Sequence, residues 1–282
     1  MTSRTLFSVG GLLTLGAVAL ASPTFPNRGS AASSGQIPGE TAAAFGRYAA
    51  VASDATLAEL YDPDVFLNVR SLEPRERTVA LAQVRAGGTS IRRLRRGQPT
   101  GGDIDIPKAW LHHWIGTAFV PSATLDEVLA VAQDYDDHAR IFAPDVVHSS
   151  ILRRHSDTEM LVRLRVRAKR IITVTYETHH EVRYERLTPK RAFSTAHATW
   201  VREILDANKP GEREKPEGEG YLWRVRGTWR YEEVDDGVLM ENESLMLTRQ
   251  VPWLLRPIVG PLVRNGPRDG VQKALQAVRR EV

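Results

Sequence analysis

The 282-residue sequence contains no cysteine. This absence excludes disulfide bonds, thiol catalysis and a lipid anchor attached through cysteine. It does not argue against export, because a domain of this length can be stabilised by its hydrophobic core alone. The sequence also lacks a glycine-rich phosphate loop, a GxSxG nucleophile elbow and an HExxH zinc motif. No sequence motif therefore identifies a reaction that this protein catalyses.

The longest apolar run lies at the N-terminus. Arg4 precedes the run Leu6 to Leu20, and Ala19 to Ala21 form the small-x-small pattern that signal peptidase recognises. We therefore expect a Sec-type signal peptide over residues 1–21 and a periplasmic or secreted protein. An uncleaved anchor is the alternative, although a run of about fifteen residues is short for a hydrocarbon core of roughly 30 Å.

Two further segments precede the main domain. Residues 22–39 are rich in Ser, Gly, Pro and Ala and predict a flexible spacer. Residues 40–108 predict an N-terminal helical extension that packs on the main domain, with helices over Thr41–Tyr61 and Glu73–Arg85. A short strand is expected over Thr89–Leu94.

Residues 109–282 have the pattern of an α+β domain. A strand over Trp110–Val120 is followed by two short helices, Leu125–Gln133 and Asp136–Phe142. Six strand patterns separated by turns then predict an antiparallel meander. Their ranges are 145–153, 158–169, 171–187, 191–205, 220–233 and 238–250. The chain closes with a long helix that Gly266-Pro267 should interrupt.

This order of elements resembles the START-like or SRPBCC superfamily, which has the helix-grip fold. The stretches that carry the resemblance are FVPSATLDEVLAVAQDYDDHARIFAPDV, GYLWRVRGTWRYEEVDDGVLMENESLMLTRQVPW and RPIVGPLVRNGPRDGVQKALQAV. The texture is closest to exported bacterial members and to coenzyme-Q-binding START-type proteins. The resemblance implies a curved antiparallel sheet of about seven strands that holds a cavity under the long C-terminal helix.

Strand alternation selects the side chains that should line this space, because successive residues point to opposite faces of a sheet. The expected ligand-binding residues are Trp114, Val162, Leu164, Tyr176, His180, Trp223, Trp229, Ile258 and Leu262. Apolar walls would supply affinity, and His180 with Tyr176 would orient the polar end of the ligand. A packed aromatic core is the competing interpretation of the same residues.

The paired histidines of WLHHWIG, residues 110–116, raise the question of a metal. Neighbours on a strand face opposite sides, so His112 and His113 cannot chelate one ion together. A mononuclear site would need one of them with His180 and His197. We expect no metal and no cofactor, and histidines that line the core or the cavity.

Charge gives a weak indication of partners. The formal net charge is +4, and the basic cluster IRRLRRG, residues 91–97, permits contact with a membrane surface. Nucleic acid is not expected for an exported protein, and we expect a monomer.

Three functions fit these patterns. The first is an exported binding protein for a hydrophobic small molecule or lipid held between the sheet and the C-terminal helix. The second is a cyclase or aromatase-like enzyme in which His180 or Glu241 moves a proton inside the same cavity. The third is a structural envelope protein whose interior is filled by its own side chains.

Overall fold

The computed structural model describes residues 37–97, 104–169, 173–250 and 256–282, without the side chains of residues 169 and 256–264. All of these residues belong to one compact unit, Ser33–Val282. The predicted signal peptide and most of the predicted spacer lie outside the described residues, so export stays a prediction.

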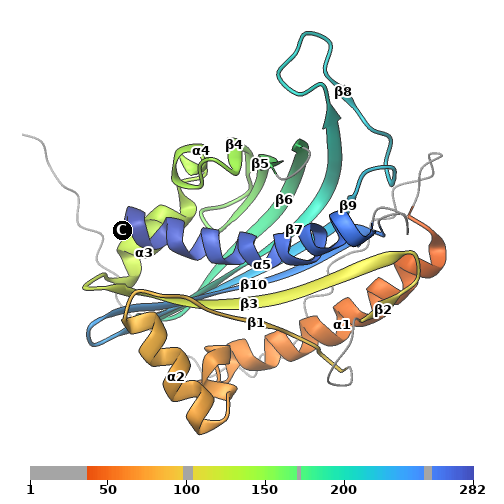
Figure 1. The fold of residues 1–282 in the computed structure, drawn as a ribbon. Helices are drawn as coiled ribbons and strands as arrows, with labels where there is room; N and C mark the ends of the chain where they lie inside the picture. The colour runs from red at the N-terminus through yellow and green to blue at the C-terminus, as the bar shows by residue number, and fades with distance from the viewer. Residues whose placement is uncertain (1–36, 98–103, 170–172, 251–255) are drawn as a thin grey trace, which may run out of the picture. The chain divides into compact units, whose positions relative to one another are not determined.

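Ten strands of the described residues form one antiparallel sheet (Figure 1). Their order is β1-β3-β10-β9-β7-β6-β5-β4, while β2 pairs with β3 and β8 pairs with β7. The bounds are β1 Ser90–Arg93, β2 Asp105–Ile106, β3 Ala109–Pro121, β4 Val146–Arg154, β5 Glu159–Lys169, β6 Thr173–Thr188, β7 Arg191–Leu205, β8 Arg213–Glu214, β9 Leu222–Val234 and β10 Gly237–Arg249. The predicted α+β class and meander are confirmed.

The predicted strand count of about seven was too low. β1, predicted in the extension, pairs with the outer edge of β3 and so belongs to the same sheet. β2 and β8 have two residues each. Strands this short carry no two-residue periodicity that a sequence pattern could reveal.

One side of the sheet, called here the α5 face, is covered by α3 Leu125–Gln133 and α5 Arg256–Glu281. A capping box between Thr124 and Glu127 fixes the start of α3, and α4 His138–Ile141 follows it. The expected interruption at Gly266-Pro267 is absent from α5, which is helical from end to end. None of the helices in the described part of the chain is both long and apolar enough to cross a bilayer.

The other side, called here the α1 face, is covered by the N-terminal extension. Its elements are α1 Gly39–Tyr61, the 3-10 helix η1 Asn68–Ser71 and α2 Pro74–Arg85. Phe45 and Tyr48 of α1 pack with Leu111 and Leu247 of the sheet, and Val84 of α2 packs in a second cluster with Phe119. In Figure 1, β3 and β10 accordingly run between α5 and α1. These two strands are buried on both faces, so their sequences cannot show a simple apolar and polar alternation.

Candidate ligand-binding site

The packing on the α5 face changes along the strands. At one end, Val120, Tyr231 and Met240 are fully buried in a cluster with α3 and α5. Tyr184 closes this end by donating to the carbonyl oxygen of Ala132 at 2.8 Å. The apolar contacts make this end of the face a packed core.

Two glycines on the α5 face mark where close packing stops. A Cβ on Gly116 of β3 would lie 2.6 Å from Leu275 Cδ1 and 2.7 Å from Val271 Cγ1, so α5 rests directly on this glycine. A Cβ on Gly227 of β9 would meet only the carbonyl oxygen of Glu243, at 3.8 Å, among the residues whose side chains are described. Gly227 is opposite Ser244, which in turn is opposite Trp114. The described side chains therefore fill less of the space above the middle of the sheet than of the space above Gly116.

Two polar atoms buried on the α5 face, on strands near opposite edges of the sheet, have no hydrogen-bond partner among the described residues. They are the indole Nε1 of Trp114 and the hydroxyl oxygen of Ser149. Ser149 is only 6% exposed, and it pairs with Leu164, which packs against the α5-face core. A buried polar atom without a partner costs about 1–3 kcal/mol, so a bound group that completes either hydrogen bond would be stabilised.

Six of the nine predicted site residues lie on the α5 face. Val162 is fully buried in the core cluster, and Leu164, Trp114 and Trp229 are partly buried against it. His180 pairs with Val162, and Tyr176 pairs with Val166, two positions further along the same face than Leu164. Trp229 also stacks on Tyr231 with ring centroids 6.0 Å apart.

His180 and Tyr176 share this face but do not meet. They are four residues apart on β6, so their Cα atoms are separated by about 13 Å. His180 Nε2 instead bonds to Thr178 Oγ1 at 2.8 Å. Burial lowers the pKa of His180 to about 4, so its imidazole is neutral at pH 7 and can donate or accept one further hydrogen bond. Burial raises the pKa of Tyr176, which stays protonated.

Trp223 does not lie on this face. The pairing of β9 with β10 shifts between Leu247 and Thr248, where Arg224 and Leu222 are the successive partners and Trp223 has none. This β-bulge inserts one residue and reverses the alternation beyond it. Trp223 therefore packs on the α1 face with Leu245 and Leu247, contrary to the prediction that it lines the space under α5. The side chains of Ile258 and Leu262, also predicted, lie outside the described residues.

The paired histidines occupy opposite faces, as the strand period requires. His112 bonds to Thr248 Oγ1 at 2.9 Å, whereas His113 points to the α1 face. His113 and His180 consequently lie on opposite sides of the sheet and cannot bind one metal ion.

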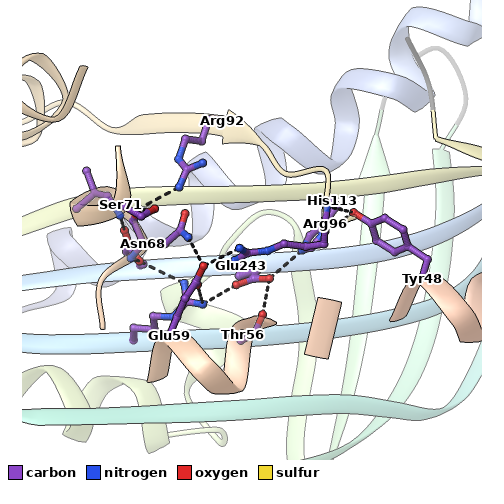
Figure 2. A network of polar contacts seen from close by, with 12 residues as sticks. Tyr48, Thr56, Glu59, Asn68, Ser71, Arg92, Arg96, His113 and Glu243 are labelled. Carbon is purple, nitrogen blue, oxygen red and sulfur yellow. Dashed lines mark hydrogen bonds and ion pairs between the residues drawn. The ribbon is translucent and has the colours of Figure 1, made fainter. Parts of the chain in front are cut away.

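The α1 face holds a buried network that the sequence patterns did not reveal (Figure 2). His113 Nε2 lies 2.8 Å from Glu243 Oε1, and His113 Nδ1 lies 2.8 Å from the hydroxyl of Tyr48 on α1. Because an ionised Glu243 only accepts, Nε2 carries the hydrogen, and in the neutral imidazole Nδ1 accepts from Tyr48. Thr56 of α1 donates to the same carboxylate at 3.0 Å. With His113 1% exposed and Glu243 5% exposed, this relay joins α1 to the sheet and is closed to a substrate.

Arg230 is the centre of this network. Its guanidinium reaches Glu59 at 2.9 Å, Glu243 at 2.8 Å and Glu241 at 3.3 Å. Glu241 also accepts from the backbone amides of Asn68 and Val69 at the start of η1. Glu241 is therefore held on the α1 face and cannot act in a cavity under α5, which leaves His180 as the only predicted proton carrier on that side.

The basic cluster IRRLRRG is also part of this interface. Arg96 pairs with Glu59 at 2.6 Å, and Arg92 donates to the carbonyl oxygen of Asn68 at 3.2 Å. Both arginines face the extension in Figure 2. This engagement reduces the charge that the cluster can offer to a membrane surface.

Acid is expected to weaken the α1 interface. Burial alone would raise the pKa of Glu243, but the hydrogen bond from His113 and the charge of Arg230 lower it from 4.5 to about 2. A folded-state pKa below the unfolded value stabilises the protein above pH 4.5, and this stability is lost as the pH falls towards 2. Glu243 alone should contribute a loss of about 3 kcal/mol in the free energy of unfolding over this window. Glu241 acts in the opposite direction, because burial raises its pKa.

The measurement is urea denaturation at about pH 6 and about pH 3 for the wild-type protein and Glu243→Gln. The variant should be less stable at the higher pH and should lose less on acidification. Equal losses in the two proteins would contradict the assignment.

The comparisons with known proteins concern the fold. No family model matches this sequence, and no curated protein is significantly similar to it. Three solved structures with a detectable likeness to this chain have TM-scores below 0.5. A STAR-related lipid transfer protein of Xanthomonas axonopodis is 20% identical, with 68% of this chain and 99% of that chain covered and a TM-score of 0.43. The Zhui aromatase/cyclase of Streptomyces sp. R1128 is 18% identical, with coverages of 61% and 93% and a TM-score of 0.41. Human StAR-related lipid transfer protein 5 is 14% identical, with coverages of 86% and 97% and a TM-score of 0.40. At this level of similarity, the chemistry must be argued from the residues of this chain.

Proposed function

We propose that this protein binds a hydrophobic small molecule or lipid between the α5 face of the sheet and α5. The observation that carries the proposal is the contrast between Gly116, on which α5 rests, and Gly227, above which the described side chains leave space. Apolar and aromatic side chains surround that space on the neighbouring strands, which is typical of small-molecule sites.

The polar atoms on the same face indicate what the ligand carries besides its apolar body. Trp114 Nε1 is a donor, Ser149 can donate or accept, and His180 is neutral at pH 7. These groups match a ligand with a carbonyl or hydroxyl group. A neutral polar end fits better than a charged one, because His180 supplies no charge at this pH.

A substitution at Gly227 tests this proposal directly. Gly227→Leu adds a side chain to the free space and is expected to remove the bound ligand while the fold stays intact. Native mass spectrometry and lipid extraction of the purified protein should recover an apolar molecule from the wild type but not from the variant. Circular dichroism and thermal unfolding would show whether the variant is folded.

The matched control is Thr199→Leu, which adds similar bulk at an exposed position of β7. It should retain the ligand. The binding proposal would be wrong if no apolar molecule were recovered from the folded wild-type protein. It would also be wrong if the wild type and Gly227→Leu yielded equal amounts. Either result would favour a filled interior.

A further inference from the structure

Three arginines gather on the α1 face where β7 and β9 separate. The pairing of these strands ends at His197 opposite Arg226, and Arg224 follows two residues beyond this last pair. The regular pairing of β9 with β10, which continues up to the bulge, places Arg224 opposite Leu247, which packs on the α1 face. Arg202 of β7 lies on the same face, opposite Glu177. This site is on the other side of the sheet from the proposed ligand under α5.

Among the described residues, the guanidinium groups of Arg224 and Arg226 have only neutral neighbours at contact distance. Arg226 lies over the ring of Phe45 at 5.9 Å and donates to Ser53 Oγ at 3.4 Å, and its buried Nε has no partner among the described residues. Arg224 donates to the carbonyl oxygen of Trp223 at 2.9 Å. Both side chains are half-buried, and within the described residues neither forms an ion pair.

The surrounding charges leave this positive charge uncompensated. Glu217 is the carboxylate that acts on Arg224, but it lies 3.4 Å from Arg202 and is 41% exposed. Burial, together with the charges of Arg226 and Arg224, lowers the pKa of His197 to about 4. Burial also lowers the pKa of both arginines, although a guanidinium stays protonated at pH 7. Among the side chains outside the described part, only Asp103 is acidic.

Half-buried charges without a counter-ion destabilise a folded protein, so a bound anion would be favoured at this place. We propose that Arg224 and Arg226, with Arg202 at the rim, bind a phosphate monoester group. Two guanidiniums match the two negative charges of a phosphate monoester, and its tetrahedral oxygens can accept hydrogen bonds from both. The phosphate belongs either to a soluble metabolite or to a lipid headgroup.

The experiment measures binding of phenyl phosphate to the full-length chain by isothermal titration calorimetry and by the shift in melting temperature. Phenyl phosphate should raise the melting temperature of the wild type, because a ligand that binds only the native state stabilises it. Arg224→Gln and Arg226→Gln should each weaken binding by about tenfold or more. The control Arg183→Gln, which removes an exposed arginine of β6, should bind as the wild type does.

A second measurement separates binding from a structural role. Without phosphate, Arg224→Gln and Arg226→Gln should keep or raise the melting temperature, because they remove uncompensated charge. A lowered melting temperature would show that the chain itself neutralises Arg224 and Arg226, and this would overturn the proposal. Tight phosphate binding that appears only in Asp103→Asn would lead to the same conclusion. Equal phosphate binding by all variants would also overturn it.

Vesicles distinguish the two sources of phosphate. Arginine-dependent binding to phosphatidylcholine vesicles that contain phosphatidic acid, compared with phosphatidylcholine alone, supports a lipid headgroup. Binding of phenyl phosphate without binding to these vesicles supports a soluble ligand. If the protein binds neither phenyl phosphate nor these vesicles, the proposed phosphate site is wrong.

Discussion

Arg230→Met is expected to lower the free energy of unfolding by about 3–5 kcal/mol, which is typical when one partner of a buried ion network is removed. The substitution keeps much of the side-chain volume but removes the cation that three carboxylates share. Glu241 is the most affected, because it is 0% exposed and Arg230 is its ion-pair partner. The backbone amides of Asn68 and Val69 would remain its donors, so η1 should stay near the sheet while the interface loosens.

Urea denaturation of matched variants measures this effect. Arg183→Met makes the same chemical change at an exposed position of β6 and should cost less than about 0.5 kcal/mol. The free energy of unfolding of Arg230→Lys should lie between those of the wild type and Arg230→Met. An ammonium keeps the charge but lacks the planar guanidinium that reaches several carboxylates. A loss below about 1 kcal/mol for Arg230→Met would contradict a central role for this arginine.

The element order was predictable because each element has a local signal. The helical spacing in residues 41–61 and the capping pattern at Thr124 are properties of neighbouring residues, and both helices form where those signals lie. The turns that join β4 to β5, β6 to β7 and β9 to β10 carry Pro or Asp, so most of the meander could also be predicted. Local signals are sufficient here because a meander connects strands that are neighbours in sequence.

The details of the site depend on interactions between distant residues. The shift that moves Trp223 to the α1 face arises from pairing with Leu247 and Thr248, and the letters around Trp223 alternate as in a regular strand. The relay from Tyr48 to Glu243 joins residues almost two hundred positions apart, through His113. The sequence does show Glu241 and Glu243 at a spacing of two beside an arginine-rich strand. This spacing alone does not identify Arg230 as the partner of the two carboxylates or show that α1 buries the network.

Gly116→Val is expected to destabilise the protein by about 1–3 kcal/mol through overpacking. The new Cβ would lie 2.5 Å from Ile91 Cδ1 and closer than 3 Å to Leu275 and Val271, so α5 would have to move away from β3. Leu275 is fully buried in the core cluster, and the shift would therefore disturb contacts well beyond the substituted residue.

Gly227→Val is the matched control, because it makes the same change on the same face of the sheet. The described side chains leave room for a Cβ at Gly227, and valine favours strands more than glycine does. The free energy of unfolding should therefore change by less than about 0.5 kcal/mol or increase. Urea denaturation of the two ligand-free variants gives the comparison. If both variants were destabilised equally, the α5 face would be packed alike at both glycines, and the space proposed for a ligand would not exist. A large loss at Gly116 alone would show that α5 touches the sheet at one end and leaves room at the other.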